Sequence, residues 1–367
     1  MAVDASGELA RTLASGYTLP AAWYSDPAVL QLERERIFAR SWQYVGRAGQ
    51  VAEPGDFLAA RAGHIPIVVV RDEHGDLNGF VNVCRHRGHE VVSGAGNRRT
   101  LQCPYHAWTY GLDGCLRSVP RLEREPDLPV AELSLRRVQV ETWGPFVFVN
   151  PDLDAAPLTG TLGGIPRLVA ETGFDLDALE YDGRWEWTIE ANWKVSIENY
   201  LECYHCPVAH PGFSELLDVD PDTYRLSSDR WTSSQRAPVR PAVLAGERPA
   251  AFDLRGGSTE AQYHFVWPNF TINIEAGVPN VGVDLWLPDG PDRTAGSSER
   301  WFAPDVPRAL RDEMTGFAQQ VGREDNSLCE SVHRGLASGM VPQGRLMRES
   351  EPLIAHFQQL VFDALSG

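Results

Sequence analysis

The segment that most constrains this chain is CRHRGHEVVSGAGNRRTLQCPYHAW, residues 84–108. It contains a Cys84-x-His86 pair, a spacer of 16 residues and a Cys103-x-x-His106 pair. The whole chain has only 6 Cys and 10 His, so this segment is dense in both. Thiolate and imidazole are typical ligands of borderline-soft metals. Two such pairs separated by a hairpin-length spacer predict two loops that close on one metal site.

Zinc is the simplest alternative, because Cys2His2 is a common tetrahedral zinc site. A zinc finger, however, takes both Cys from one pair and both His from the other. Here each pair supplies one Cys and one His. This alternation is typical of a Rieske [2Fe–2S] centre, in which two Cys bind one iron and two His bind the other. We therefore predict that Cys84, His86, Cys103 and His106 bind [2Fe–2S] and that His89 is not a ligand.

The composition argues against several other classes. The chain has 367 residues and a formal net charge of -17, which makes it a poor partner for nucleic acid. It contains no run of about 18 apolar residues, so no membrane segment is expected. Its N-terminus lacks the pattern of a signal peptide. We expect a cytoplasmic protein, in which disulfides are a poor explanation for the cysteines.

The hydrophobic pattern predicts an α+β chain in three parts. Residues 1–44 are expected to be an N-terminal helical segment, and 45–155 a mostly β domain that contains the Cys/His segment. Residues 156–367 are expected to form a larger domain with strands and helices. A hairpin is predicted at 65–84, where two β-rich runs flank DEHGD. In the larger domain, strands at 261–290 precede helices at 306–338 and 349–365.

A second group of metal-binding side chains lies in NWKVSIENYLECYHCPVAHP, residues 192–211. We expect 196–207 to be a helix that ends at its proline and carries Glu202 and His205 on one face. The prolines that follow can turn His210 toward His205. Two His and one carboxylate form the facial triad of Fe(II) oxygenases, so a third, anionic ligand is needed.

The Rieske pattern followed by Glu202-x-x-His205-x4-His210 resembles the Rieske non-haem iron oxygenases, catalytic (α) subunit, over nearly the whole chain. The resemblance implies an N-terminal Rieske domain and a C-terminal helix-grip (START-like) catalytic domain with an antiparallel sheet and helices. It implies that His205, His210 and Asp325 bind a mononuclear Fe(II). Glu324, next to Asp325, is the weaker candidate for the third ligand.

Glu202 matches the position of an acidic residue that, in this family, hydrogen-bonds an iron-bound His and a cluster His of the neighbouring subunit. Most members have Asp there. Glu within ECYHC resembles the branch that oxidises quaternary ammonium compounds such as carnitine and glycine betaine. Glu202 and the nearby Asn199 are therefore the candidate catalytic residues.

The resemblance implies a terminal oxygenase, an oxidoreductase that uses O2 and two external electrons to hydroxylate a small organic substrate. Monooxygenation, dioxygenation and oxidative demethylation all fit. The chain lacks a Gly-x-Gly-x-x-Gly fingerprint after a strand, so NAD(P)H and flavin are expected only on a separate reductase. That partner would be a flavin/iron–sulfur reductase, acting directly or through a ferredoxin. A homotrimer is also implied.

Two substrate classes remain open. A quaternary ammonium compound needs an aromatic box and a carboxylate. The candidate rings are Tyr200, Tyr204, Phe213, Phe265, Trp267, Phe270 and Trp286. An aromatic acid would instead need an arginine in the pocket. The candidate arginines are Arg225, Arg236 and Arg240.

Two further protein classes fit less of the chain. A Rieske electron carrier would not need a second histidine pair, and a START-like ligand-binding protein would not need the acidic and histidine residues of the second group. The Cys203-x-x-Cys206 pair is expected to be two buried structural thiols rather than a zinc or redox site. His264 and His333 are expected to be packing residues.

Overall fold

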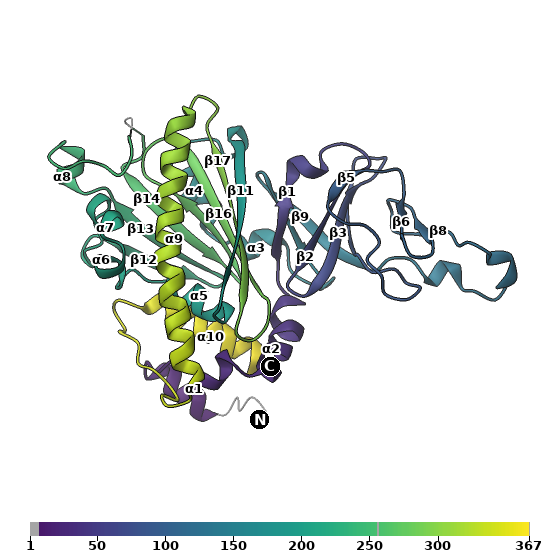
Figure 1. Cartoon of the computed structure of the whole chain (residues 1–367), viewed down its shortest axis with the longest axis horizontal. Coiled ribbons are helices and arrows are strands. Elements are labelled where there is room, and N and C mark those ends of the chain that lie inside the picture. Colours follow the sequence, from purple (N-terminus) through teal and green to yellow (C-terminus); the bar gives the residue numbers. More distant parts are fainter. Residues whose placement is uncertain (1–6, 255–256, 367) are drawn as a thin grey trace. The chain divides into compact units, whose positions relative to one another are not determined.

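The computed structural model describes residues 7–254 and 257–366 (Figure 1). They form two compact units, one containing the residues up to Glu33 and from Thr161 onward, the other Arg34–Gly160. The predicted fold class is confirmed, since one unit is mostly β and the other combines an antiparallel sheet with helices. In the described part of the chain, no helix is both long and apolar enough to cross a membrane.

The unit Arg34–Gly160 is built on a seven-stranded antiparallel sheet with the order β1-β10-β9-β4-β3-β2-β5. The predicted hairpin at 65–84 is the β3–β4 pair. The strands are β1 (Gln43–Arg47), β2 (Asp56–Ala62), β3 (Ile65–Arg71), β4 (Leu77–Val81), β5 (Ala95–Asn97), β9 (Arg137–Trp143) and β10 (Phe146–Asn150). A smaller sheet contains β6 (Leu101–Gln102), β7 (Thr109–Tyr110) and β8 (Leu116–Ser118).

Strand β3 shows how this unit supports the Cys/His segment. Ile67–Val70 are all fully buried, because both faces of the strand are covered. Alternation places Ile67 and Val69 in one apolar cluster and the other two residues in a second cluster. Cys84 and Cys103 belong to that second cluster. The loops that carry the predicted cluster ligands therefore rest on a packed apolar layer.

The other unit is built on a second seven-stranded antiparallel sheet with the order β11-β17-β16-β15-β14-β13-β12. Its strands are β11 (Glu180–Ile189), β12 (Arg225–Asp229), β13 (Thr232–Pro238), β14 (Glu260–Val266), β15 (Phe270–Ile274), β16 (Asn280–Pro288) and β17 (Thr294–Phe302). Its helices are α1 (Gly7–Ala14), α2 (Pro27–Glu33), α4 (Ile165–Ala170), α5 (Trp193–Tyr200), α6 (Cys206–Ala209), α7 (Pro211–Leu216), α8 (Pro241–Leu244), α9 (Arg308–Ala337) and α10 (Pro352–Ser366). The short helix α3 (Leu158–Leu162) lies at the boundary of the two units.

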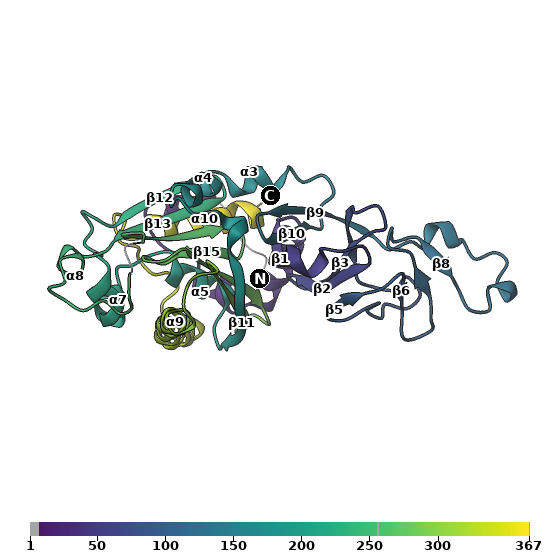
Figure 2. The ribbon, with the colours of Figure 1, turned by 90° about the horizontal axis from the view of Figure 1, so that it is seen from above.

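The sequence predicted β14–β16, α9 and α10, but not β12, β13 or β17. The unpredicted strands contain runs such as SSQ and SSER, and so lack the apolar alternation that signals a half-buried strand. Their polar residues are nevertheless buried in β13 and β17. Helix α9 runs along one face of this sheet, as its end-on view shows (Figure 2).

A polar network joins the N-terminal segment, α5 and α10. The hydroxyl of Tyr24 donates to Glu198 Oε1 at 2.6 Å, and the Gln358 amide donates to the same oxygen at 3.0 Å. Burial raises the pKa of Glu198 to about 7, because the charged form loses hydration, although these two donors and Lys194 act in the opposite direction.

We predict a pH-dependent stability effect at Glu198. Its folded-state pKa lies above the unfolded value, so its stabilising contribution is present below about pH 4.5 and is lost as the pH rises to about 7. Glu198→Gln removes this loss. Between pH 5 and pH 8, the variant should gain about 2 kcal/mol relative to wild type. Thermal unfolding of the holoprotein at both pH values measures this, with the exposed Glu313→Gln on α9 as control. A difference that stays constant with pH would contradict the prediction.

Candidate metal centres and substrate pocket

The predicted cluster ligands lie on two loops with the same backbone pattern. In the first, the Gly88 N–H donates to the Cys84 carbonyl at 3.0 Å. In the second, the Ala107 N–H donates to the Cys103 carbonyl, also at 3.0 Å. Gly88 and Ala107 both have positive φ angles, of 79° and 56°. The two loops are therefore matched turns, as expected for two pairs that face one site.

Sulfur and imidazole donors occupy different depths in these loops. Cys84 and Cys103 are free and buried, at 4% and 1% exposure. Burial and the neighbouring Cys84 raise the pKa of the Cys103 thiol. The His86 and His106 rings are 4.5 Å apart between centroids, and His86 is exposed. The structure thus brings together two buried thiols and two outer imidazoles, a donor set that suits a Rieske cluster.

Aromatic residues pack around this donor set. Trp108 stacks on His86 with a ring separation of 4.9 Å, and Tyr105 lies against His106 at 3.8 Å. Of the tyrosines, Tyr110 contacts a cysteine sulfur: its hydroxyl is 3.3 Å from Cys84 Sγ. The sequence did not single out Tyr110. Its position as the second residue of the short strand β7 offered no motif that could have revealed it.

The predicted helix over 196–207 is wrong. Helix α5 ends at Tyr200, and α6 begins at Cys206 after a turn. The carboxylate of Glu202 accepts hydrogen bonds from the backbone N–H groups of Tyr204 and His205, so it stabilises this turn rather than a continuous helix. The proline after Cys206 fits the first turn of the new helix, where a missing N–H costs nothing.

His205, His210 and Asp325 meet at one point. The Nε2 atoms of the two histidines are 3.1 Å apart. Asp325 Oδ1 lies 2.9 Å from His210 Nε2 and 3.4 Å from His205 Nε2. These ligand atoms all lie within 4.8 Å of one another. The arrangement has the chemistry of a two-histidine, one-carboxylate iron site.

A carboxylate holds the far nitrogen of each histidine. His205 Nδ1 donates to Glu202 Oε1, and His210 Nδ1 lies 2.7 Å from Glu324 Oε2. Both Nδ1 atoms therefore carry the proton, which leaves both Nε2 atoms to bind metal. Two consecutive residues of α9 thus contact opposite nitrogens of one ring: Asp325 faces Nε2 of His210 and Glu324 faces its Nδ1.

These carboxylates make the site strongly anionic. Burial lowers the pKa of His205, but hydrogen bonds to Asp325 and Glu202 outweigh it and raise the pKa to about 9. The pKa of His210 is also raised, against the effect of burial, by Asp325 and Glu324. The surroundings therefore favour positive charge at the point where the histidines meet, as a metal site requires.

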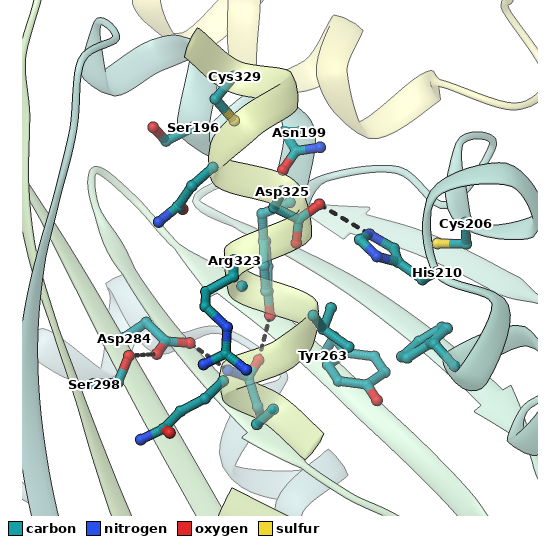
Figure 3. Close-up of a pocket in the computed structure, with 18 of the residues that line it drawn as sticks. Ser196, Asn199, Cys206, His210, Tyr263, Asp284, Ser298, Arg323, Asp325 and Cys329 are labelled. Carbon is teal, nitrogen blue, oxygen red and sulfur yellow. Dashed lines mark hydrogen bonds and ion pairs between the residues drawn. The ribbon is translucent and has the colours of Figure 1, made fainter. Parts of the chain in front are cut away.

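The histidines and Asp325 open onto a cavity of about 410 Å³ between the sheet and α9 (Figure 3). Asn199, the other candidate catalytic residue, also lines it. Of the candidate rings, three line the cavity: Tyr200, Phe213 and Trp286. The sequence interpretation missed the lining rings of Trp185, Trp187, Tyr224, Tyr263 and Phe317. The W-x-W alternation of β11 was the one signal available, since it puts both indoles on one face.

The three candidate arginines do not line the cavity, so that prediction is wrong. Arg225 and Arg236 both pair with Glu260, and Arg240 pairs with Asp218. The cavity is instead lined by two arginines that the sequence did not single out, Arg300 and Arg323.

The expectation for the Cys203-x-x-Cys206 pair was also wrong in part. Both residues are buried, but their sulfurs form a disulfide, with the Cα atoms 4.9 Å apart. A Cα separation of 4.9 Å also fits two residues three apart on a helix, so the Cys-x-x-Cys spacing already allowed this bond. His264 is a packing residue as predicted, fully buried and bonded to Ser234 and Gln262. His333 is likewise buried.

The fold and the two donor sets define a class of enzyme. Residues 41–140 match the Rieske [2Fe-2S] domain, and residues 176–367 match the catalytic domain of the ring hydroxylating alpha subunit. The chain belongs to the Rieske non-haem iron oxygenases and is a catalytic (α) subunit. It is an oxidoreductase that acts on O2 and an organic substrate, with a [2Fe–2S] cluster and a mononuclear iron as cofactors.

Similar proteins include two kinds of monooxygenase. The chain is 32% identical over 356 residues to the carnitine monooxygenase oxygenase subunit of Acinetobacter baumannii, covering 94% of each chain. It is 34% identical to the chloroplastic choline monooxygenase of Arabidopsis thaliana, covering 94% of this chain and 82% of the relative. A solved quaternary ammonium Rieske monooxygenase, described in connection with carnitine oxidation, matches with a TM-score of 0.84 and 30% identity over 95% of each chain. Naphthalene 1,2-dioxygenase from Rhodococcus, at 23% identity and a TM-score of 0.80, shares the fold.

Proposed function

We propose that this chain is the terminal oxygenase for a quaternary ammonium substrate. Cys84, His86, Cys103 and His106 would hold the [2Fe–2S] cluster, because two buried free thiols and two neighbouring imidazoles are the donor set it needs. His205, His210 and Asp325 would hold the mononuclear iron. The convergence of these three ligand atoms within 4.8 Å is the single observation that carries the assignment of an oxygenase site.

When bound, this iron supplies activation of O2 for attack on a substrate C–H bond, with the cluster as the source of a second electron. The chain's own residues prepare that chemistry. Glu202 and Glu324 accept the Nδ1 protons of His205 and His210, which fixes both rings. We further propose that Glu202 and Asn199 are the catalytic residues beside the iron.

The electrons would come from a separate flavin/iron–sulfur reductase that uses NAD(P)H, directly or through a ferredoxin. This chain would act as a cytoplasmic homotrimer. The similar quaternary ammonium Rieske monooxygenase of known structure is described as transferring electrons between subunits, and this supports an assembly in which one subunit's cluster serves its neighbour's iron. We also propose the domain bounds: the Rieske domain is 45–155 and the catalytic domain is 156–367. Residues 1–44 form a helical segment of the catalytic domain.

The substrate class follows from the aromatic end of the cavity. The Trp187 and Trp286 rings are 5.8 Å apart, and the Tyr200 ring is 5.7 Å from Trp286. Asp284 lies on the same strand face as Trp286 and also lines the cavity. Electron-rich ring faces with a nearby carboxylate suit a methylated ammonium group. The relatives' names agree with this chemistry.

Gly296→Ala tests the aromatic box. Trp187 lies so close over Gly296 that an added Cβ would stand 2.0 Å from its ring, so the indole must move. We expect choline and γ-butyrobetaine, which share the cation, to bind about 10-fold more weakly. Gly316→Ala on α9 is the control, because its Cβ meets nothing within 4 Å. Equal affinities in all three proteins would argue against the box.

Iron counting tests the oxygenase assignment. The wild-type chain should carry three irons, and Cys103→Ser should lose the cluster pair and the Rieske spectrum but keep the mononuclear iron. The cluster potential should lie within roughly -150 to +300 mV. A colourless zinc protein would refute the assignment.

The substrate is identified by the compounds that trigger oxidation of the reduced cluster by O2. If an aromatic acid triggers this oxidation and quaternary ammonium compounds do not, the proposed substrate class is refuted.

A further inference from the structure

Arg300 is a buried cation on the floor of the cavity. It projects from β17, where its partners across the sheet are Gly183 on β11 and Gly282 on β16. The absence of a side chain at Gly282 leaves room for the guanidinium, whereas an added Cβ at Gly183 would meet nothing within 4 Å. It lies directly over Gly282, whose added Cβ would stand 1.9 Å from Arg300 Nη1. The residue is 6% exposed and lines the cavity.

The hydrogen-bonding capacity of Arg300 is poorly used. Its buried Nε has no hydrogen-bond partner. Its nearest carboxylate, Glu275, is 4.0 Å away and accepts a hydrogen bond from the Tyr263 hydroxyl at 2.8 Å. A buried guanidinium without well-placed acceptors is costly, and its planar fork is suited to a carboxylate. Arg300 therefore has an N–H donor without an acceptor, and a ligand can supply that acceptor.

The other groups of this region do not fill that need. Asp284 already accepts from Asn273 at 2.6 Å and from Ser298 at 2.5 Å. A second guanidinium, that of Arg323, points from α9 into the same cavity (Figure 3). Among the described residues, no carboxylate forms an ion pair with Arg323. The cavity thus offers two guanidinium groups with donors to spare.

We propose that Arg300, assisted by Arg323, binds a carboxylate of the substrate, so that the enzyme acts on zwitterions that carry a quaternary ammonium at one end and a carboxylate at the other. This inference rests on the proposed function and narrows it. Gly282, beneath Arg300, and Trp286, in the aromatic box, are four residues apart on β16, about 13 Å along the strand. Arg300 and Trp286 line the same cavity.

Matched ligands test the proposal on the wild-type holoenzyme. Binding of γ-butyrobetaine is compared by calorimetry with that of its methyl ester, which keeps the cation and loses the anionic charge, and with choline. We expect the acid to bind about 10- to 100-fold more tightly than the ester. If the wild-type enzyme binds the acid and the ester with equal affinity, this result alone overturns the proposal.

Variants then assign the effect to the arginines. Arg300→Gln should remove most of the preference for the acid over the ester and leave choline binding unchanged, and Arg323→Gln should reduce that preference. Arg184→Gln, on β11 and paired with Glu299, is the matched control. If Arg300→Gln leaves Glu275 unbalanced and the protein does not fold, the Arg300→Gln/Glu275→Gln double variant replaces it. A preference that survives in the folded variant would refute the role of Arg300.

The proposed function and the proposed carboxylate subsite can be refuted independently of each other. If benzoate binds in an Arg300-dependent manner while no quaternary ammonium compound binds, the carboxylate subsite is supported and the zwitterion is refuted, together with the proposed substrate class. If choline and the ester bind as well as the acid, the quaternary ammonium class stands and the carboxylate subsite is refuted.

Discussion

Asp325→Ala should lose the mononuclear iron and all measurable turnover while the Rieske spectrum persists. Asp325 Oδ1 is the only carboxylate oxygen of the described residues placed with both Nε2 atoms, at 2.9 and 3.4 Å. Without it, two neutral imidazoles remain, and an open site on two ligands binds iron poorly. Metal analysis should fall from three irons to two per chain. Turnover should fall by far more than the 10- to 100-fold typical of losing an outer partner of a ligand.

Two matched changes on the same helix make this result specific. Asp312→Ala, at an exposed ion pair with Arg308, should leave three irons. Glu324→Gln keeps the size of the group that accepts from His210 Nδ1 but weakens the bond, so iron affinity should fall about 10- to 100-fold. If Glu324→Ala loses the iron and Asp325→Ala retains it, the assignment of the third ligand is wrong by one residue.

Glu202→Gln should load both metal sites and yet slow the oxidation of the reduced cluster by O2 and substrate. One oxygen of Glu202 accepts from His205 Nδ1 and the other accepts from the backbone of the following turn. A Gln has one acceptor oxygen, so it cannot keep both sets of bonds. In a trimer whose electrons cross between subunits, the same carboxylate would also meet a cluster histidine of the neighbour. Single-turnover rates should therefore fall by about 100-fold.

The conservative variant and a distant control complete this test. Glu202→Asp keeps the charge but is one methylene shorter, so part of the rate should remain. Glu215→Gln, exposed on α7, should match the wild type. Oxidation of the Glu202→Gln cluster at the wild-type rate would show that electrons take another route and that Glu202 only supports the turn before α6.

Some features of the site were predictable because they depend on residue type and spacing. The alternation of Cys and His at 84–106 predicted a Rieske donor set, and the spacing of His205 and His210 predicted a second metal pair. The order of Asp325 and Glu324 could not be derived in this way. Both are acids on one helix, one residue apart, and both contact His210 on opposite nitrogens. Only the direction in which each side chain leaves α9 separates the proposed ligand from its proposed support.

By itself, the sequence determined the chemistry of the donors, the α+β class and the family, because these follow from which residues occur at which local spacing. The tertiary structure alone decided the turn at Glu202, the Cys203–Cys206 disulfide and the lining of the cavity. Arg300 and Arg225 look alike in the sequence, but strand pairing buries Arg300 over Gly282 and leaves Arg225 paired with Glu260 at the surface. The physical reason is that side chains alternate between the two faces of a strand at the same spacing, so the sequence does not say which face is the inner one. Packing against α9 decides which face meets the substrate.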